Sequence, residues 1–107
     1  GALPEAIDID LAELEEIKFG NTTLRVMATP GHSKGCVSLY HEESKSLFTG
    51  DTLFRESIGR TDLPGGDMAT LIRSLNRLVL LPEDTQVYPG HGYPTTIAHE
   101  KMYNPYL

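Results

Sequence analysis

Residues 36–51, CVSLYHEESKSLFTGD, decide the fold because they contain two apolar runs joined by a short polar segment. The length of the runs and the polar residues between them predict an antiparallel hairpin, with strands near residues 36–41 and 46–49. Each run contains two adjacent apolar residues, a leucine followed by a tyrosine or a phenylalanine. Adjacent apolar residues in a strand are typical of a sheet that is covered on both faces. We therefore expect both faces of this sheet to be covered.

A second hairpin is predicted immediately before this one. In residues 15–28, EEIKFGNTTLRVMA, apolar side chains alternate on either side of Gly20 and the asparagine after it, and these two residues favour a tight turn. After the central stretch, residues 67–81, DMATLIRSLNRLVLL, repeat apolar residues with the i, i+3, i+4 spacing of an amphipathic helix. Asp67 is a good N-cap for this helix, and Pro82 ends it.

The C-terminal part of the chain predicts one more strand and one more helix. TQVYPG, residues 85–90, has the pattern of a strand, and TTIAHEKMY, residues 95–103, that of a short helix. The expected order is four strands, a helix, a strand and a helix, without internal repeats or a Pro/Ser-rich linker. We therefore expect one α/β domain over residues 1–107, in which residues 1–13 form a poorly determined N-terminal segment.

The composition excludes several classes of function. The chain has 107 residues, of which 39% are hydrophobic and 22% charged, and this fits a small globular domain. The formal net charge of −6 argues against a nucleic-acid partner or an anionic membrane surface, because both attract clustered Lys and Arg. The single cysteine, Cys36, cannot form an internal disulfide, and no apolar stretch approaches the roughly 20 residues of a membrane span. We expect a cytoplasmic protein that acts on a small molecule.

Three polar residues share one sequence context. His32, Asp51 and His91 each follow a predicted strand closely, and each comes directly after a glycine. Glycine permits tight backbone conformations and leaves space beside the next side chain. Ligands gather outside the strand ends of open α/β sheets, so these three side chains are able to converge. Two imidazoles and a carboxylate suit Zn²⁺ or Fe²⁺, which makes the three residues candidate metal ligands.

The remaining polar candidates lack this context. His41 and His99 have no neighbouring glycine, and we interpret both as structural or solvent-exposed. Cys36 is interpreted as a small hydrophobic residue within a strand. In the stretch GRTDLPGGD, Arg60 either binds a substrate carboxylate or, together with Asp62, serves neighbouring backbone groups in a self-contained loop.

Five stretches of the chain together resemble one known family. TPGHSKG, LFTGDTLF, IGRTDLPGGD, VYPGHG and EKMYNPYL occur in the order and spacing typical of the metallo-β-lactamase superfamily, in its glyoxalase II-like (hydroxyacylglutathione hydrolase-like) branch. The similarity runs from about residue 17 to the C-terminus. It implies an αββα sandwich of two halves with a dinuclear metal site between the sheets. The chain resembles only the C-terminal half of this sandwich, which implies one mixed, mostly antiparallel sheet with helices on one face.

The resemblance implies roles for individual residues. His32 matches a histidine of the first metal site, His91 matches a histidine of the second, and Asp51 matches the carboxylate that bridges both metals. Asp51 is thereby the catalytic candidate, and Arg60 is the candidate for substrate binding. The implied reaction is hydrolysis of an acyl-glutathione-type thioester or small ester by a metal-bound hydroxide, with two zinc ions in the full-length parent or with iron instead.

One family motif has no counterpart here. The chain contains nothing like H-x-H-x-D-H, and it begins with Gly1. The resemblance therefore implies a C-terminal fragment of a longer enzyme, whose missing N-terminal half supplies further metal ligands. We expect the isolated chain to be inactive, to bind Zn²⁺ weakly, and to form a homodimer or exchange segments through the sheet face that the missing half would cover.

Two alternatives to a thioester hydrolase stay open. The GRTD element also resembles persulfide dioxygenases, which use one iron, and two histidines with one carboxylate suit Fe(II). True glyoxalase II enzymes carry an aromatic, basic loop at this place and a helical extension for glutathione, whereas this chain ends at NPYL. The third interpretation is a non-catalytic interaction module that has kept the fold.

Overall fold

Local antiparallel pairing forms the first part of the sheet in the computed structural model, which describes residues 14–62 and 64–107. Gly20 turns the first hairpin with a φ of 59°, in the left-handed region that glycine tolerates. Both predicted hairpins are confirmed, with boundaries that differ from the expected ones by one residue or less. Their four strands are β1 (Glu15–Phe19), β2 (Thr22–Ala28), β3 (Val37–His41) and β4 (Ser46–Gly50).

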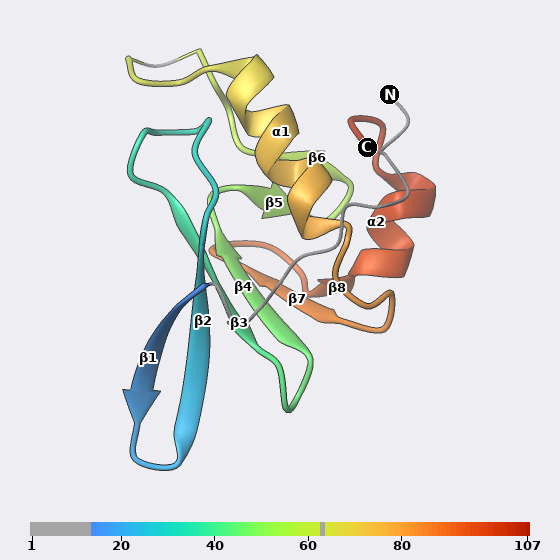
Figure 1. Cartoon of the computed structure of the whole chain (residues 1–107). Coiled ribbons are helices and arrows are strands. Elements are labelled where there is room, and N and C mark those ends of the chain that lie inside the picture. Colours follow the sequence, from blue (N-terminus) through green and yellow to red (C-terminus); the bar gives the residue numbers. More distant parts are fainter. Residues whose placement is uncertain (1–13, 63) are drawn as a thin grey trace.

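A parallel strand pair completes the main sheet. β7 (Gln86–Pro89) pairs with β4 in parallel, and the short β8 (Thr95–Thr96) pairs with β7 in antiparallel fashion. The strand order is β1-β2-β3-β4-β7-β8, so four of the five neighbouring pairs are antiparallel. The predicted α/β class with one mixed, mostly antiparallel sheet and helices on one face is confirmed (Figure 1).

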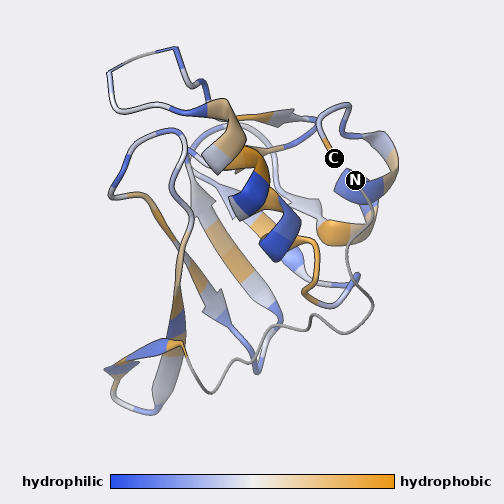
Figure 2. Cartoon of the chain, turned by 45° about the horizontal axis from the view of Figure 1, so that its top comes forward, coloured by the Kyte–Doolittle hydropathy of each residue, from blue (hydrophilic) through white to orange (hydrophobic). Residues whose placement is uncertain are grey.

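The helix α1 (Met68–Leu78) covers one face of the sheet (Figure 1). Its apolar spacing buries Leu71, Leu75 and Leu78 completely, and each such side chain stabilises the fold by about 1.5–3 kcal/mol. Hydrophobic and hydrophilic residues are interspersed along the ribbon of this helix (Figure 2). The core that it forms with the sheet contains Met27, Tyr40, Leu47, Leu53, Leu71, Leu75, Leu78, Leu81, Val87 and Ile97.

The ends of α1 differ in detail from the prediction. Asp67 occupies the N-cap position with extended backbone, but its side chain caps no backbone N–H. The carboxylate instead accepts a hydrogen bond from Thr70 Oγ1 at 2.5 Å. The helix ends at Leu78, four residues before Pro82, because Leu80 N–H and Leu81 N–H bond to carbonyls three residues earlier and tighten the last turn.

Short elements account for the remaining differences. The two-stranded sheet of β5 (Leu53–Phe54) and β6 (Ser57–Ile58) was not predicted, because two-residue strands have no periodicity to detect. The C-terminal helix α2 (Ile97–Tyr103) starts two residues later than expected, since Thr95 and Thr96 pair with β7. Thr96 then caps the helix by accepting a hydrogen bond from His99 N–H.

The second face of the sheet carries apolar side chains that the described residues leave accessible. Leu39, Phe48 and Tyr88 are register partners on adjacent strands and therefore lie on the same face. Phe48 is 41% and Tyr88 39% exposed, and their rings stack with centroids 5.4 Å apart. The expectation that both faces are covered is wrong for the described part of the chain. The adjacent apolar residues reveal two apolar faces, of which only one packs on helices.

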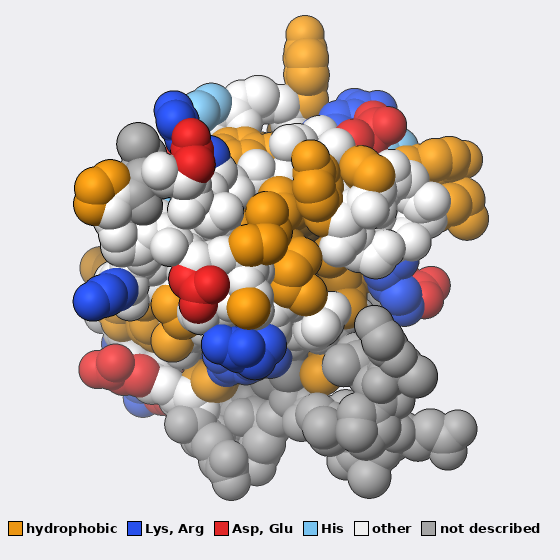
Figure 3. All heavy atoms as spheres, turned by 90° about the horizontal axis from the view of Figure 1, so that it is seen from above, with side chains coloured by type: hydrophobic (Ala, Val, Ile, Leu, Met, Phe, Trp, Pro, Cys, Tyr) orange, Lys and Arg blue, Asp and Glu red, His pale blue; other side chains and the backbone are white. Residues whose placement is uncertain are grey.

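No helix in the described ranges 14–62 and 64–107 is both long and apolar enough to cross a membrane. Seen from above, hydrophobic side chains gather in the middle of the visible face, and charged side chains of both signs are scattered around them (Figure 3). This face therefore presents neither a continuous basic patch nor a continuous acidic patch.

Candidate metal centre

The parallel pairing of β4 and β7 brings two of the candidate ligands together. Asp51 directly follows β4, and His91 follows β7 by two residues. Because the strands run in the same direction, their ends meet at one edge of the sheet. A hydrogen bond of 2.8 Å from Gly90 N–H to the Gly50 carbonyl joins the two segments just before the candidate residues.

The two candidate histidines converge on the carboxylate of Asp51, the third candidate ligand. His91 Nε2 lies 3.4 Å from Asp51 Oδ1, and His32 Nε2 lies 3.9 Å from Asp51 Oδ2. Each carboxylate oxygen thus faces a different imidazole. The three side chains are half-buried or exposed, with 23% exposure for His32, 44% for Asp51 and 77% for His91. The structure therefore leaves this group open to solvent, and His91 is its most accessible member.

The backbone of the next loop fixes the orientation of His32. Its Nδ1 lies 2.8 Å from the carbonyl oxygen of Arg60. A carbonyl only accepts hydrogen bonds, so Nδ1 must carry a proton, and the neutral ring then has its lone pair on Nε2. Nε2 is the atom that faces Asp51. This is the arrangement that metal-binding histidines use, with the second ring nitrogen held by a carbonyl or carboxylate.

Two glycines allow the backbone to pass close to Asp51. A Cβ atom at Gly59 would lie 1.9 Å from the Asp51 carbonyl oxygen and 3.3 Å from the Cβ of His32. A Cβ atom at Gly90 would lie 3.1 Å from the Gly50 carbonyl oxygen and 3.4 Å from Asp51 Oδ1. Neither space holds a side chain without movement of the neighbours. Gly59 and Gly90 are therefore required by close approach, whereas Gly31 and Gly50, which directly precede His32 and Asp51, have positive φ values of 138° and 52°.

The donor set suits a metal ion in chemistry and spacing, but it is small. Two donors bound to one tetrahedral Zn²⁺ at about 2.1 Å are about 3.4 Å apart, close to the separations on either side of Asp51. Within residues 14–62 and 64–107, however, no group of three or more His, Cys, Asp or Glu side chains is arranged to hold a metal ion by itself. The described residues therefore do not form a complete metal site by themselves.

Arg60 forms hydrogen bonds with two residues, through its carbonyl oxygen with His32 and through its side chain with Asp62. Arg60 Nε and Nη2 donate to the two carboxylate oxygens of Asp62 at 2.8 and 2.9 Å. This side-chain hydrogen bond, with the attraction between the charges, lowers the pKa of Asp62 and raises the pKa of Arg60. The two side chains therefore bond to each other, whereas the loop interpretation expected them to bond to neighbouring backbone groups.

Two adjacent cavities lie at the centre. The first, of about 280 Å³, is lined by His32, Asp51, Phe54, Gly59, Arg60 and His91. The second, of about 670 Å³, shares Phe54 and His91 with the first and extends to Tyr93. The Phe54 ring lies 5.6 Å from the His91 ring, centroid to centroid. Phe54 was not among the candidates predicted from the sequence, although it lies three residues after Asp51 in the stretch LFTGDTLF.

The other candidate residues lie apart from this centre. His41 Nδ1 bonds to Ser44 Oγ at 2.5 Å in the β3–β4 turn, and the His99 ring lies tilted against the Tyr103 ring with a centroid distance of 4.8 Å. Cys36 is half-buried and precedes β3 instead of lying within it; its Sγ is 3.0 Å from Ser33 Oγ.

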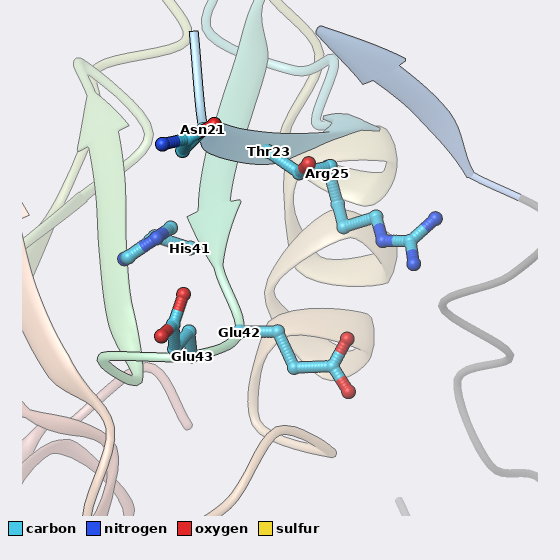
Figure 4. A pocket seen from close by; sticks show the side chains of 6 residues that line it. All are labelled: Asn21, Thr23, Arg25, His41, Glu42 and Glu43. Carbon is cyan, nitrogen blue, oxygen red and sulfur yellow. The ribbon is translucent and has the colours of Figure 1, made fainter. Parts of the chain in front are cut away.

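A separate cavity of about 450 Å³ lies between the two hairpin turns (Figure 4). In the close view, His41 and Glu43 lie on one side of this cavity, and the Arg25 side chain points away from them. Arg25 is already paired with Glu16. The cavity therefore combines few converging groups and is not the candidate centre.

Comparison with known proteins identifies the family. The family model of the metallo-beta-lactamase superfamily matches residues 1–91. A probable metallo-hydrolase of Streptococcus pyogenes is 51% identical over 83 residues, which cover 77% of this chain and 36% of the relative. Hydroxyacylglutathione hydrolase GloC of Haemophilus influenzae is 43% identical over 96 residues, which cover 89% of this chain and 45% of the relative.

Solved structures agree with this assignment. BLEG-1 B3 metallo-beta-lactamase has a TM-score of 0.83 at 47% identity, over 88% of this chain and 46% of its own. TTHA1623 in a di-iron-bound form has a TM-score of 0.79 at 47% identity, over 88% and 47%. ETHE1 from Myxococcus xanthus has a TM-score of 0.80 at 42% identity, over 85% and 42%. The chain spans about half or less of the length of these relatives. Its sequence, its fold and its cluster of His and Asp residues together show that the chain belongs to the metallo-beta-lactamase superfamily.

Proposed function

We propose that the chain is the C-terminal part of a metal-dependent hydrolase that acts on an acyl-glutathione-type thioester or a small ester. The observation that carries the proposal is the position of Asp51, which presents one carboxylate oxygen to each of His32 and His91. A carboxylate placed in this way suits a bridge between two metal ions. The likeness to a hydroxyacylglutathione hydrolase and to a probable metallo-hydrolase supports the class of reaction.

The chain's own residues have distinct tasks in this proposal. His32 and His91 donate through Nε2, and the Arg60 carbonyl keeps the His32 lone pair on that atom. Metal ions held there would polarise the scissile carbonyl and lower the pKa of a bound water. Phe54 lies against the His91 ring and lines the smaller cavity at the centre. The larger neighbouring cavity, of about 670 Å³, has room for a substrate next to the centre.

Arg60 is proposed to bind a carboxylate of the substrate. Its side chain is 61% exposed, and its guanidinium is already oriented by Asp62 at the smaller cavity, which Arg60 lines. A substrate carboxylate would share or replace the Asp62 contact. The pairing of Arg60 with Asp62 therefore holds the guanidinium in position and also neutralises its charge while no substrate is bound.

The missing ligands are proposed to come from the N-terminal half of the same fold. That half would cover the sheet face on which Phe48 and Tyr88 are exposed. Alone, the chain is expected to cover this face with a second copy of itself, because apolar surface left in water costs about 25 cal/mol per Å². The proposal therefore predicts an inactive isolated chain and an active full-length protein.

The test uses the full-length protein with bound metal determined. Hydrolysis of lactoylglutathione with two zinc ions or two mixed metal ions per chain is the expected result, and Asp51→Asn should abolish it. Oxygen consumption with glutathione persulfide and one iron per chain would favour the mononuclear-iron persulfide dioxygenase alternative, which the GRTD element suggests. A full-length protein that turns over neither substrate and binds no metal would contradict both and favour a non-catalytic interaction module.

A further inference from the structure

The mechanism leaves one buried ionisable side chain without a role. Glu100 on α2 is completely buried, and none of its three hydrogen-bond partners is a cation. Its Oε1 accepts from the backbone N–H of Glu56 at 2.8 Å and from Asn104 Nδ2 at 2.9 Å, and its Oε2 accepts from Thr95 Oγ1 at 2.7 Å. A carboxyl group in such a place is costly unless these bonds form, so a simpler apolar residue would serve mere packing better.

The partners of Glu100 show what it holds. Glu56 is at the tip of the β5–β6 hairpin and has a φ of 58°, a left-handed conformation that is uncommon for a residue other than glycine. Asn104, at the end of α2, donates to the carbonyl of Ser57 at 3.0 Å. His99 Nε2, which is shielded from water, lies 3.5 Å from Glu56 Oε2. Two residues of α2 and its C-cap residue, Asn104, therefore contact two neighbouring residues at the hairpin tip, Glu56 and Ser57.

The base of the same hairpin belongs to the metal centre. The hairpin starts two residues after Asp51, and a hydrogen bond of 3.0 Å from Gly59 N–H to the Thr52 carbonyl closes it. The carbonyl oxygen of Arg60, the next residue, accepts a hydrogen bond from His32 Nδ1. On the other side, Phe54 packs on His91. One short hairpin thus contacts both candidate ligand histidines.

We propose that Glu100 is a positioning residue, which sets the orientation of His32 and His91 by fixing the β5–β6 hairpin from the side of α2. When the contacts of Glu100 with the hairpin tip are lost, the Arg60 carbonyl and the Phe54 ring move relative to the two imidazoles. That the histidines serve a metal rests on the proposed function; that Glu100 positions them does not.

The tautomer of His32 reports this positioning directly. A free neutral imidazole side chain prefers its proton on Nε2, whereas the Arg60 carbonyl holds the proton on Nδ1. Long-range ¹H–¹⁵N NMR of the chain, recorded about two pH units above the ordinary histidine pKa, distinguishes the two forms. The wild-type chain should show the Nδ1-protonated form for His32. Glu100→Ala should replace it with an averaged or Nε2-protonated form and should shift the His91 signals.

Two variants separate positioning from general stability. Glu100→Gln keeps an acceptor oxygen for the Glu56 N–H and should restore the wild-type His32 tautomer. Leu78→Ala removes a buried side chain from α1 and should lower the stability while leaving both imidazole patterns unchanged. If Glu100→Ala does not fold, Asn104→Ala should give the same change in smaller proportion. This variant loses the Ser57 contact, one Glu100 contact and the hydrogen bond from Tyr106 N–H, while the Glu56 N–H and Thr95 contacts of Glu100 remain.

The proposal is overturned if Glu100→Ala and Asn104→Ala leave the imidazole signals of wild type, or if Leu78→Ala changes them to the same extent. Metal binding is read separately, on the full-length protein. If the His32 and His91 signals respond to Glu100→Ala but the full-length protein binds no metal ion, the metal function fails and the positioning role stands.

Discussion

Gly59→Ala is the perturbation with the most direct structural consequence at the centre. The added Cβ would lie 1.9 Å from the carbonyl oxygen of Asp51, whereas ordinary van der Waals contact begins at 3.4 Å. One of the two backbones must therefore retreat by up to 3.4 − 1.9 = 1.5 Å. Functional groups in a binding site tolerate displacements of about 0.5 Å, so the change should disturb the arrangement of Asp51 and His32. Overpacking of this kind costs about 1–3 kcal/mol of stability.

Gly35→Ala is the matched control. A Cβ at Gly35 meets nothing within 4 Å, and the residue has no positive φ, so the variant should differ from wild type by no more than about 0.5 kcal/mol. Gly90→Ala should lie between the two, because its Cβ would be 3.1 Å from a carbonyl oxygen. Urea unfolding of the three variants gives the order of stability, and histidine NMR gives the effect on the centre.

We expect the loss of stability to increase in the order Gly35→Ala, Gly90→Ala, Gly59→Ala. Equal unfolding midpoints for Gly59→Ala and Gly35→Ala would refute the reasoning, since the close approach at Asp51 would then impose no constraint. A destabilised Gly59→Ala with unchanged His32 signals would show that the strain relaxes away from the centre.

Three further predictions concern the sheet face, the metal and the pH response. At tens of micromolar, the isolated chain should elute as a dimer or larger species in size-exclusion chromatography with light scattering, and Phe48→Lys should favour the monomer; a monodisperse wild-type monomer would contradict the exposed-face argument. The isolated chain should lose Zn²⁺ during dialysis against a chelator, because the described residues provide an incomplete donor set, and stoichiometric zinc after dialysis would show this inference to be wrong. The hydrogen bond from Lys45 lowers the pKa of Asp84 below its ordinary value of 3.8, so the pair stabilises the fold above that pH and the contribution is lost as the pH falls through the lower folded-state value. Asp84→Asn should therefore flatten the acid limb of a plot of unfolding midpoint against pH, and an unchanged limb would exclude a role for this pair.

Local periodicity explains which parts of the fold were predictable. Strand alternation and the turn at Gly20 are properties of a few neighbouring residues, so both hairpins followed from the sequence. The same holds for α1, whose buried leucines recur with helical spacing. The β5–β6 hairpin did not follow, because contacts distant in the chain determine it. Glu100 and Glu56, for example, are 44 residues apart.

The candidate centre was predictable in part for a different reason. The glycine before each of His32, Asp51 and His91 is a local sign of constrained backbone, and the structure brings these three residues together. Gly90 allows a close approach, Gly50 adopts a positive φ, and Gly31 does both. The roles of the Arg60 carbonyl and of Phe54 were not visible in the sequence. A backbone carbonyl has no residue signature, and an apolar ring beside a metal centre resembles any core residue until its neighbours are known.

The parallel pairing of β4 with β7 also bears on the order of folding. The β1–β4 segment pairs only neighbours in sequence, and such contacts form early. β7 reaches β4 only after the intervening residues 51–85, including α1, close a long loop, which carries an entropic cost that hairpins avoid. Asp51 and His91 are far apart in sequence, and they therefore meet late in folding. A nascent chain that has emerged only as far as Thr85 already contains the hairpins and the helix, and it gains the two-histidine arrangement only with the last strand segment.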